Sequence, residues 1–334
     1  LFTLCVDVVH EATGEVLAGA RAALMTIENG KPFTTVNSEM DATIGWILAH
    51  KAEGKGVVYT NTDGDQPGCL GRMLDDIIGW GFEPRILGNN KLFLDHYQTP
   101  AGVKPWVPVG GNAYMMAGAA DGSKLALELA VVANSYGYPP LKRGMYGPQT
   151  DKNHLIDTFM KLTDFDKLSN GHIDYTLGTT EPNMGGPVFV VAYANDTRLR
   201  AEMNHYKKGK GPYYLFFRDH HLGSIEATST IAEAALFFSA AITPRKWCCD
   251  VITLCKKDLK NGSHLDCIGG YDYYGLAETR ESVVAEDLLP LGLAEYAVLK
   301  KDLQKDQAIK MDMVELEDNI AVRLREEQDA LLSR

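Results

Sequence analysis

The sequence predicts an α/β protein in which a doubly wound, parallel unit comes first and a small β-rich unit comes near the end. Strand-like and helical patterns alternate three times within residues 4–80, with short turns between them, and this alternation is typical of a parallel sheet with crossover helices. After about residue 246 the chain changes to short apolar runs and glycine-rich turns. The 334 residues are 45% apolar and 23% charged, which is the composition of a folded protein of about two or three domains.

The first unit is predicted from three apolar runs, each followed by a stretch with helical spacing of apolar residues. The expected strands and helices alternate over residues 4–10, 15–29, 32–36, 40–53, 57–60 and 69–80. Turns such as Asn29-Gly30 separate them, because glycine adopts backbone angles that end a helix.

The rest of the chain gives less regular patterns. Helices are expected over 123–135 and 226–239, and strands over 188–192, 213–217 and 249–255. Residues 140–186 are rich in Gly, Pro, Asn and Asp, which predicts long loops. Residues 318–334 alternate charged residues with Ile320, Leu324 and Leu331, which predicts an amphipathic tail helix.

Polar segments follow each of the first three expected strands. They are Ala12-Thr13-Gly14, Asn37-Ser38-Glu39 and Asp63 to Gly68. Ligands of open parallel sheets bind beyond the carboxyl ends of the strands, so these segments predict the site.

Charge and cysteine usage limit the partners and the compartment. With 33 basic and 44 acidic residues the net charge is −11, which disfavours nucleic acid and anionic membranes as partners and leaves a small-molecule substrate. The longest apolar stretch, Ile231–Ile242, is broken by Glu233 and is shorter than the ~20 residues that a bilayer requires. Six cysteines without a CxxC pair and no secretory signal predict reduced thiols in a cytoplasmic protein.

Two segments resemble a known family. Residues 6–14 (VDVVHEATG) and 30–39 (GKPFTTVNSE) resemble the later half of a Rossmann domain in homoserine dehydrogenase-like oxidoreductases. The resemblance implies that NAD or NADP binds with its nicotinamide near Ala12, Thr13 and Gly14, and that Asn37 and Glu39 share the cleft. The glycine-rich phosphate turn of such a domain is expected upstream of Leu1, so the chain is expected to be N-terminally truncated and incomplete as an enzyme.

Further motifs resemble the deoxyxylulose-phosphate reductoisomerase-like branch of these oxidoreductases. They include Asp65-Gln66-Pro67, Gly88-Asn89-Asn90-Lys91, Asp121-Gly122-Ser123-Lys124 and Ala133-Asn134. Residues 250–316 resemble the C-terminal SAF module of that branch, a β-clip-like fold. The resemblance implies a partial Rossmann-type domain over 1–84, an α+β catalytic domain over 85–245, a SAF-like domain over 246–316 and a tail helix over 317–334.

Charged residues near these motifs are candidates for catalysis. Hydride transfer to a carbonyl needs a proton donor, which Lys91 or Asp95 could supply, although a surface ion pair is the alternative for them. Lys124 and Glu128 stand four residues apart, a spacing that also occurs in ordinary helix ion pairs.

Asp63 and Asp65 could hold a divalent cation or orient substrate hydroxyls. For both, turn formation is the alternative. Glu39 could join them, or it could simply favour the start of a helix.

The substrate itself is expected to contact Asn89, Asn90, Asn134, Arg218 and His221. Arg218 and a histidine could hold a phosphate or carboxylate, and a structural histidine pair, His220 and His221, is the alternative. The run Lys207 to Lys210 is either a solvated loop or a phosphate lid.

The sequence therefore predicts an NAD(P)-dependent oxidoreductase that acts on a small hydroxylated or phosphorylated carbonyl compound. A homo-oligomer through the middle domain is compatible with the resemblance. The alternatives are a non-catalytic SAF-domain binding or assembly protein, and an inactive truncated homologue.

Overall fold

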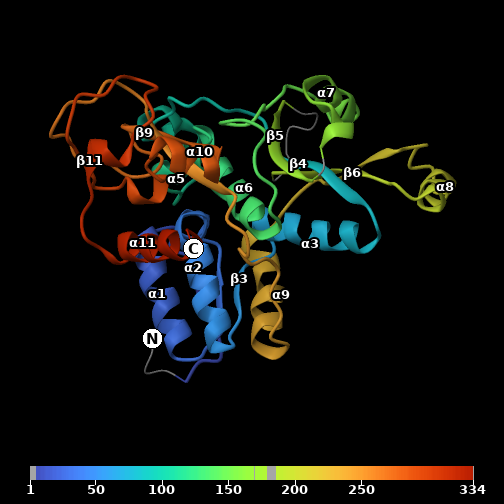
Figure 1. Cartoon of the computed structure of the whole chain (residues 1–334), viewed down its shortest axis with the longest axis horizontal. Coiled ribbons are helices and arrows are strands. Elements are labelled where there is room, and N and C mark those ends of the chain that lie inside the picture. Colours follow the sequence, from blue (N-terminus) through green and yellow to red (C-terminus); the bar gives the residue numbers. More distant parts are fainter. Residues whose placement is uncertain (1–4, 169, 179–185, 334) are drawn as a thin grey trace.

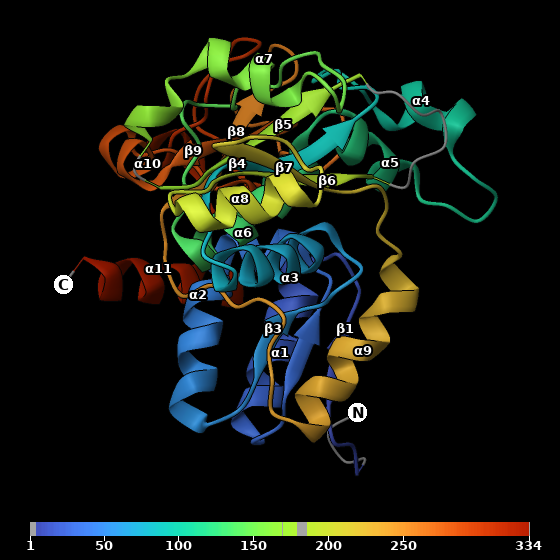
Figure 2. The same ribbon diagram turned by 90° about the vertical axis from the view of Figure 1, so that its right-hand side faces the viewer.

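The computed structural model describes residues 5–168, 170–178 and 186–333 of the chain (Figure 1, Figure 2). In Figure 1 the N-terminal helices lie at the bottom, the middle sheet at the upper right and the C-terminal strands at the upper left. The predicted α/β fold class is confirmed.

The N-terminal unit is a three-stranded parallel sheet with its crossover helices. Its strands, in the order β1-β2-β3, are β1 (Val9–Glu11), β2 (Phe33–Thr35) and β3 (Tyr59–Asn61). The helices that follow them in turn are α1 (Val16–Glu28), α2 (Ser38–Lys55) and α3 (Gln66–Gly79). Parallel neighbours need such crossovers, so the predicted alternation is confirmed.

Two predicted boundaries in this unit are wrong. The strand expected over 4–10 begins to pair only at Val9, because β2 is preceded by Pro32, which has no N–H to offer to a ladder. The carbonyl of Pro32 instead accepts a hydrogen bond from the Val9 N–H at 3.1 Å. The third helix begins at Gln66 rather than at residue 69, since Pro67 suits a first helical turn. Leu4 lies outside the described residues.

The middle unit is a mixed four-stranded sheet in the order β5-β4-β6-β7. Its strands are β4 (Glu83–Lys91), β5 (His172–Leu177), β6 (Val188–Tyr193) and β7 (Tyr213–Arg218). β4 runs parallel to β5 and antiparallel to β6, and β6 is antiparallel to β7. Helices α3 and α6 (Ser123–Tyr136) pack on one face, and α7 (Leu155–Leu162) packs on the other through Phe159 and Phe189.

The prediction of long loops over 140–186 is wrong for part of that range. It contains α7, a 3₁₀ turn over Phe165–Lys167 and β5. β5 carries a polar residue, Asp174, in its interior, which hides the strand pattern. The structure satisfies that carboxylate with the backbone N–H groups of Tyr146 and Gly147 at 2.9–3.1 Å.

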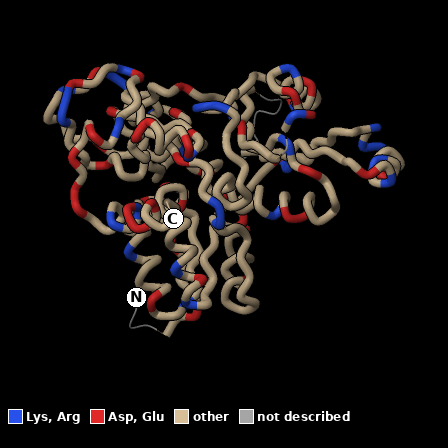
Figure 3. Tube along the Cα trace, viewed as in Figure 1, with Lys and Arg blue, Asp and Glu red and all other residues tan. Residues whose placement is uncertain are grey.

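Helix α8 (Thr197–His205) lies at the end of an arm formed by β6 and β7. Figure 3 shows basic residues gathered at this tip. Lys207 to Lys210 follow α8 directly and are exposed. These lysines therefore lie in a solvated loop, and they are not at the strand ends where the site was expected.

The C-terminal unit is built on an antiparallel pair of strands. Its elements are β8 (Cys249–Cys255), β9 (Tyr273–Thr279), α10 (Arg280–Glu286), β10 (Val298–Leu299) and β11 (Val314–Glu315). Two short helices of the middle unit, α4 (Pro100–Val103) and α5 (Ala113–Ala120), precede α6, and further 3₁₀ turns cover Lys104–Trp106, Leu291–Leu293 and Met311–Met313.

Two later segments return to the N-terminal unit. α9 (Gly223–Leu236) packs against β2, and the Asn61 N–H donates to the carbonyl of Ile242 at 3.1 Å. The tail helix α11 (Ile320–Leu332) is confirmed and packs on α1 and α2.

One apolar core runs through all three units. It includes Phe33 and Ile44 of the first unit, Leu129 of α6, Val190 of β6 and Val251 of β8. α6 passes through the middle of this core, and its residues from Leu125 to Asn134 are all buried. The helix is therefore a rigid support for the polar side chains that it carries. No helix among the described residues is long and apolar enough to cross a membrane.

Candidate active site

Glu128 of α6 is the centre of a buried charged cluster. Its carboxylate lies 3.9 Å from the Nζ atom of Lys91 and 3.9 Å from the Nζ atom of Lys124. Asn89 donates to the same carboxylate at 3.5 Å. The structure thus brings together three of the predicted catalytic residues and one predicted substrate-binding residue.

The cluster gathers the ends of three elements on the support of α6. Lys91 and Asn89 come from the carboxyl end of β4, and Lys124 and Glu128 lie one turn apart on α6. Asp65 comes from the loop after β3, where it immediately precedes α3. Of the three polar segments expected at strand ends, the one after β3 contributes Asp65 to this cluster, and β4 adds a strand end that was not among them.

Gln66 is a member of this cluster that sequence reasoning did not single out. The amide orientation that satisfies its neighbours has its nitrogen donate to Glu128 at 2.7 Å and its oxygen accept from Lys91 Nζ at 3.1 Å. The side chain is buried. The sequence signal that could have identified Gln66 as a site residue was its position directly after Asp65.

Burial sets the protonation of the carboxyls. It raises the pKa of Asp65 to about 7, helped by the negative charge of Glu128 and opposed by Lys124. Burial also raises the pKa of Glu39, against the nearby charge of Lys124. For Lys124 burial acts in the opposite direction, but Glu128, Glu39 and Asp65 outweigh it and raise its pKa. Asp65 can therefore change its protonation near neutral pH.

His221 lies beside the cluster. Its Nδ1 atom is 2.7 Å from the carbonyl of Gly186, and a Cβ on Gly186 would meet both His221 and Gln66. Burial lowers the pKa of His221 despite that carbonyl and Glu128. His220 is exposed and faces Asp219 instead, so the two histidines face different surroundings.

Arg218 and Asp63 form a second charged group. Arg218 pairs with Glu226 and lies 3.6 Å from Asp63, while Arg72 lies 3.6 Å from the other oxygen of Asp63. Cys69 completes the group, and burial raises the pKa of its thiol to about 12.

The predicted pairing of Asp63 with Asp65 around one divalent cation does not match this arrangement. Asp63 faces two guanidinium groups, whereas Asp65 interacts with Glu128 and Lys124. Asp63, Cys69 and Glu226 have oxygen and sulfur atoms within 4.8 Å of one another. However, two arginines and a protonated thiol do not suit a cation.

A cavity of about 260 Å³ opens next to Lys124. It is lined by Thr13 and Gly14 of the loop after β1, by Glu39 at the start of α2, and by residues of α5 and the C-terminal unit. Gly14 has φ +72° and open space where a side chain would point. The buried carboxylate of Glu11 fixes the loop by accepting from the Thr13 N–H at 2.6 Å; sequence reasoning did not single out Glu11.

Two predicted cofactor residues do not line this cavity. Asn37 is fully buried. Its side-chain oxygen accepts a hydrogen bond from the Met40 N–H, and its side-chain nitrogen donates one to the Glu15 carbonyl, both at 2.9 Å. It is the N-cap of α2. Ala12 is exposed on the same loop as Thr13.

Asp95 and Asn134 are not brought to the cluster either. Asp95 accepts from the Tyr97 N–H and the Gln98 amide, both at 3.0 Å, as a turn residue does. The side-chain amide of Asn134 bonds to the backbone of Cys248 and Cys249 at 2.9–3.0 Å. It therefore joins α6 to the start of β8.

A protein-family model matches the middle part of the chain. Residues 64–227 match the family model of the catalytic domain of oxidoreductase DRL. The matched segment is just under half of the chain, and it contains Asp65, Lys91, Lys124, Glu128 and His221. The chain thus contains a segment similar to an oxidoreductase catalytic domain.

Two solved structures are also similar over most of this chain. A homoserine dehydrogenase from Thiobacillus denitrificans is 12% identical with a TM-score of 0.35, covering 94% of this chain and 83% of that chain. An inositol-3-phosphate synthase from Caenorhabditis elegans is 10% identical with a TM-score of 0.25, covering 95% of this chain and 45% of that chain. No curated protein matches.

Proposed function

We propose that the chain is an NAD(P)-dependent oxidoreductase that acts on a small hydroxylated or phosphorylated carbonyl compound. The observation that carries the proposal is the Lys91–Glu128–Lys124 cluster, in which a buried carboxylate lies between two partly buried lysines, beside the cavity at Thr13 and Gly14. A carbonyl reduction needs both a proton donor and a place for the hydride carrier, and these two features lie next to each other. The match of residues 64–227 to an oxidoreductase catalytic domain supports the same conclusion.

The cavity suits a nicotinamide ring in two respects. The open space at Gly14 lets a ligand approach the backbone closely, and Lys124 connects the cavity to the charged cluster. A nicotinamide bound there would supply or accept the hydride. Thr13, Gly14 and Glu39 are the residues that would hold it.

The proposed proton donor is Lys91. Its ammonium group would give a proton to the carbonyl oxygen during reduction and would regain it through the cluster. Glu128 and Gln66 hold the ammonium in place. Asp65, with a pKa of about 7, would exchange the proton near neutral pH.

Unpartnered buried atoms support a hydroxyl-bearing substrate. Within the described residues, Asn90 Oδ1, Asp65 Oδ2 and Thr176 Oγ1 are buried without a hydrogen-bond partner. Asn90 and Thr176 are opposite each other on β4 and β5. Since buried polar atoms normally have partners, a substrate hydroxyl is a suitable ligand for Asp65, whereas Asn90 and Thr176 lie on the opposite face of the sheet from Asn89 and Lys91.

The test is turnover of NADH and NADPH with a panel of hydroxyaldehydes, hydroxyketones and their phosphate esters. Lys91→Ala is expected to lower kcat by roughly 10²–10⁴-fold, the usual contribution of a general acid, with an unchanged circular dichroism spectrum. Lys104→Ala, at an exposed lysine of the 3₁₀ turn Lys104–Trp106, is the matched control and is expected to behave as wild type. Equal turnover of the Lys91→Ala and wild-type proteins would remove Lys91 from the mechanism.

A further inference from the structure

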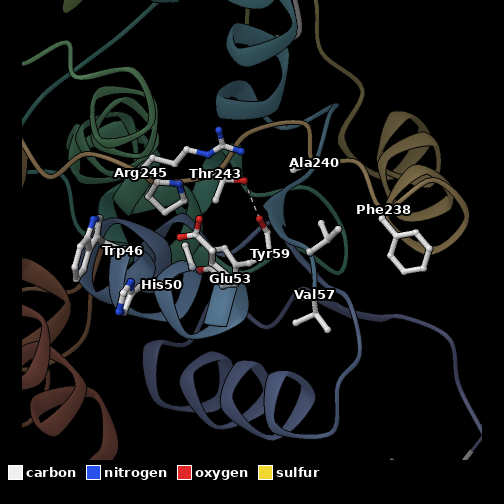
Figure 4. A pocket seen from close by; sticks show the side chains of 12 residues that line it. Trp46, His50, Glu53, Val57, Tyr59, Phe238, Ala240, Thr243 and Arg245 are labelled. Carbon is white, nitrogen blue, oxygen red and sulfur yellow. Dashed lines mark hydrogen bonds between the residues drawn. The ribbon is translucent and has the colours of Figure 1, made fainter. Parts of the chain in front are cut away.

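A second cavity, of about 530 Å³, lies along the C-terminal half of α2 (Figure 4). Its walls are residues 46–53 of α2, the start of β3 and the segment 238–245 that follows α9. Glu39, which borders the candidate active site, lies in the first turn of the same helix. At 1.5 Å per residue, about 16 Å of helix separates Glu39 from His50, so the two cavities are distinct.

Two charged side chains of opposite sign line this cavity. Figure 4 shows the carboxylate of Glu53 turned toward the segment that carries Thr243 and Arg245. Within the described part of the chain, neither Glu53 nor Arg245 has an ion-pair partner. Both side chains are exposed to solvent, and two charges of opposite sign that line one cavity favour a ligand that carries both signs.

The remaining walls are aromatic and apolar. Trp46 and His50 stack with ring centroids 5.3 Å apart and planes 3° apart. Val57 and Phe238 lie on the side of the cavity away from them (Figure 4). Phe238 is 71% exposed and has φ +53°, an uncommon backbone angle for a residue other than glycine. Such a wall accommodates an apolar or aromatic group.

The backbone holds the cavity walls in place before any ligand binds. The hydroxyl of Thr243 donates to the Tyr59 carbonyl at 2.9 Å. The two residues before Thr243 are held by the neighbouring residue of β3: the Thr60 hydroxyl oxygen accepts from the N–H groups of Ala241 and Ile242 at 3.0 and 3.1 Å. Arg245 is therefore attached to a segment fixed against β3, and preorganised walls lower the entropic cost of binding.

We propose that this cavity binds a free α-amino acid with an apolar or aromatic side chain. Arg245 binds the carboxylate, for which a guanidinium fork is well suited, and Glu53 binds the ammonium group. The side chain lies against the aromatic and apolar walls. An anion alone would be repelled by Glu53, a cation alone by Arg245, and an uncharged apolar ligand would leave both charges without a partner.

Calorimetric titration of the whole chain with L-phenylalanine and L-leucine tests the proposal. Phenethylamine, which lacks the carboxylate, and 3-phenylpropionate, which lacks the ammonium group, are the matched probes. We expect L-phenylalanine or L-leucine to saturate the site and each phenyl probe to bind about tenfold more weakly than L-phenylalanine, or not at all. No saturation by either amino acid up to about 10 mM would overturn the proposal, as would equal binding of L-phenylalanine and both probes.

Variants assign the binding to this cavity. Arg245→Gln and Glu53→Gln are each expected to weaken amino-acid binding by about tenfold or more. The exposed Arg21→Gln on α1 is the matched control and should bind as wild type. Lys91→Ala should also bind normally, so failure of the oxidoreductase proposal would leave this result unaffected. Wild-type affinity in Arg245→Gln would overturn the assignment.

Discussion

Replacing Arg325 with methionine is expected to destabilise the whole chain. Arg325 of α11 donates to the two oxygens of Asp250 on β8 at 2.6 and 3.1 Å, to Asp329 at 3.0–3.1 Å and to the Thr43 carbonyl of α2 at 3.2 Å. Its side chain is 4% exposed and that of Asp250 is fully buried. The methionine would leave Asp250 inside the protein with Arg280, at 3.1 Å, as its remaining ionic partner in the described structure.

The expected size follows from the cost of a buried charge. Removing one member of a buried ion pair costs about 3–5 kcal/mol. An unfolding entropy of about 2.1 cal/mol/K per residue gives ~0.7 kcal/mol/K for the chain, so the melting temperature should fall by roughly 4–7 °C. Because one core runs through all three units, we expect a single transition to shift, and differential scanning calorimetry measures it.

Arg323→Met on the same helix is the matched control. Arg323 pairs with Asp318 at 2.6 Å, but it is 68% exposed, and exposed pairs contribute about 0–1 kcal/mol. Its melting temperature should stay within about 1–2 °C of the wild type. If the Arg325→Met and Arg323→Met proteins melted together, the reasoning that α11 is fixed by a buried charge network would be refuted.

Three further outcomes are expected. The pKa of Asp65 is raised to about 7 in the folded state from about 3.9 in the unfolded state. The contribution of this carboxyl group to the free energy of unfolding is therefore fully present below pH ~4 and is lost as the pH rises through 7. Asp65→Asn should therefore gain stability relative to wild type across that range in urea titrations, and Asp76→Asn, on the exposed side of α3, should show no such trend. Gly68→Ala should disrupt the site loop, since the new Cβ would lie 2.0 Å from a backbone oxygen, whereas Gly54→Ala meets nothing within 4 Å and should stabilise α2 by up to ~1 kcal/mol. Asn134→Ala should cost at least about 2 kcal/mol of unfolding free energy and leave KM unchanged; a raised KM at unchanged stability would instead make it a substrate residue.

The elements that the sequence predicted well are those whose pattern is local. The three strand–helix pairs of the first unit and the helix from Ser123 were predicted because apolar spacing and glycine turns agree there. β5 was missed because its polar Asp174 is satisfied by residues 27 and 28 positions earlier in the chain. A long-range partner leaves no local signal.

The same distinction separates the predicted site residues that the structure brings together from those that it does not. Lys124 and Glu128 were found because their spacing puts them on one face of a helix. Asn134 lies on the same helix, but its partners are the backbone groups of Cys248 and Cys249, and a sequence cannot show that a polar side chain will join two units. Asp63 and Asp65 stand two residues apart and were expected to act together; the turn into α3 gives them different neighbours.

Gln66 shows why a neutral residue belongs in a site made of charges. Lys91 needs an acceptor and Glu128 needs a donor, and one amide provides both. A carboxylate at this position would place a further negative charge beside Glu128 and Asp65, whose pKa is already raised by that neighbour. A hydrophobic side chain would leave both charged partners without a hydrogen bond. The amide therefore holds the proposed proton donor next to its carboxylate without changing the net charge of the cluster.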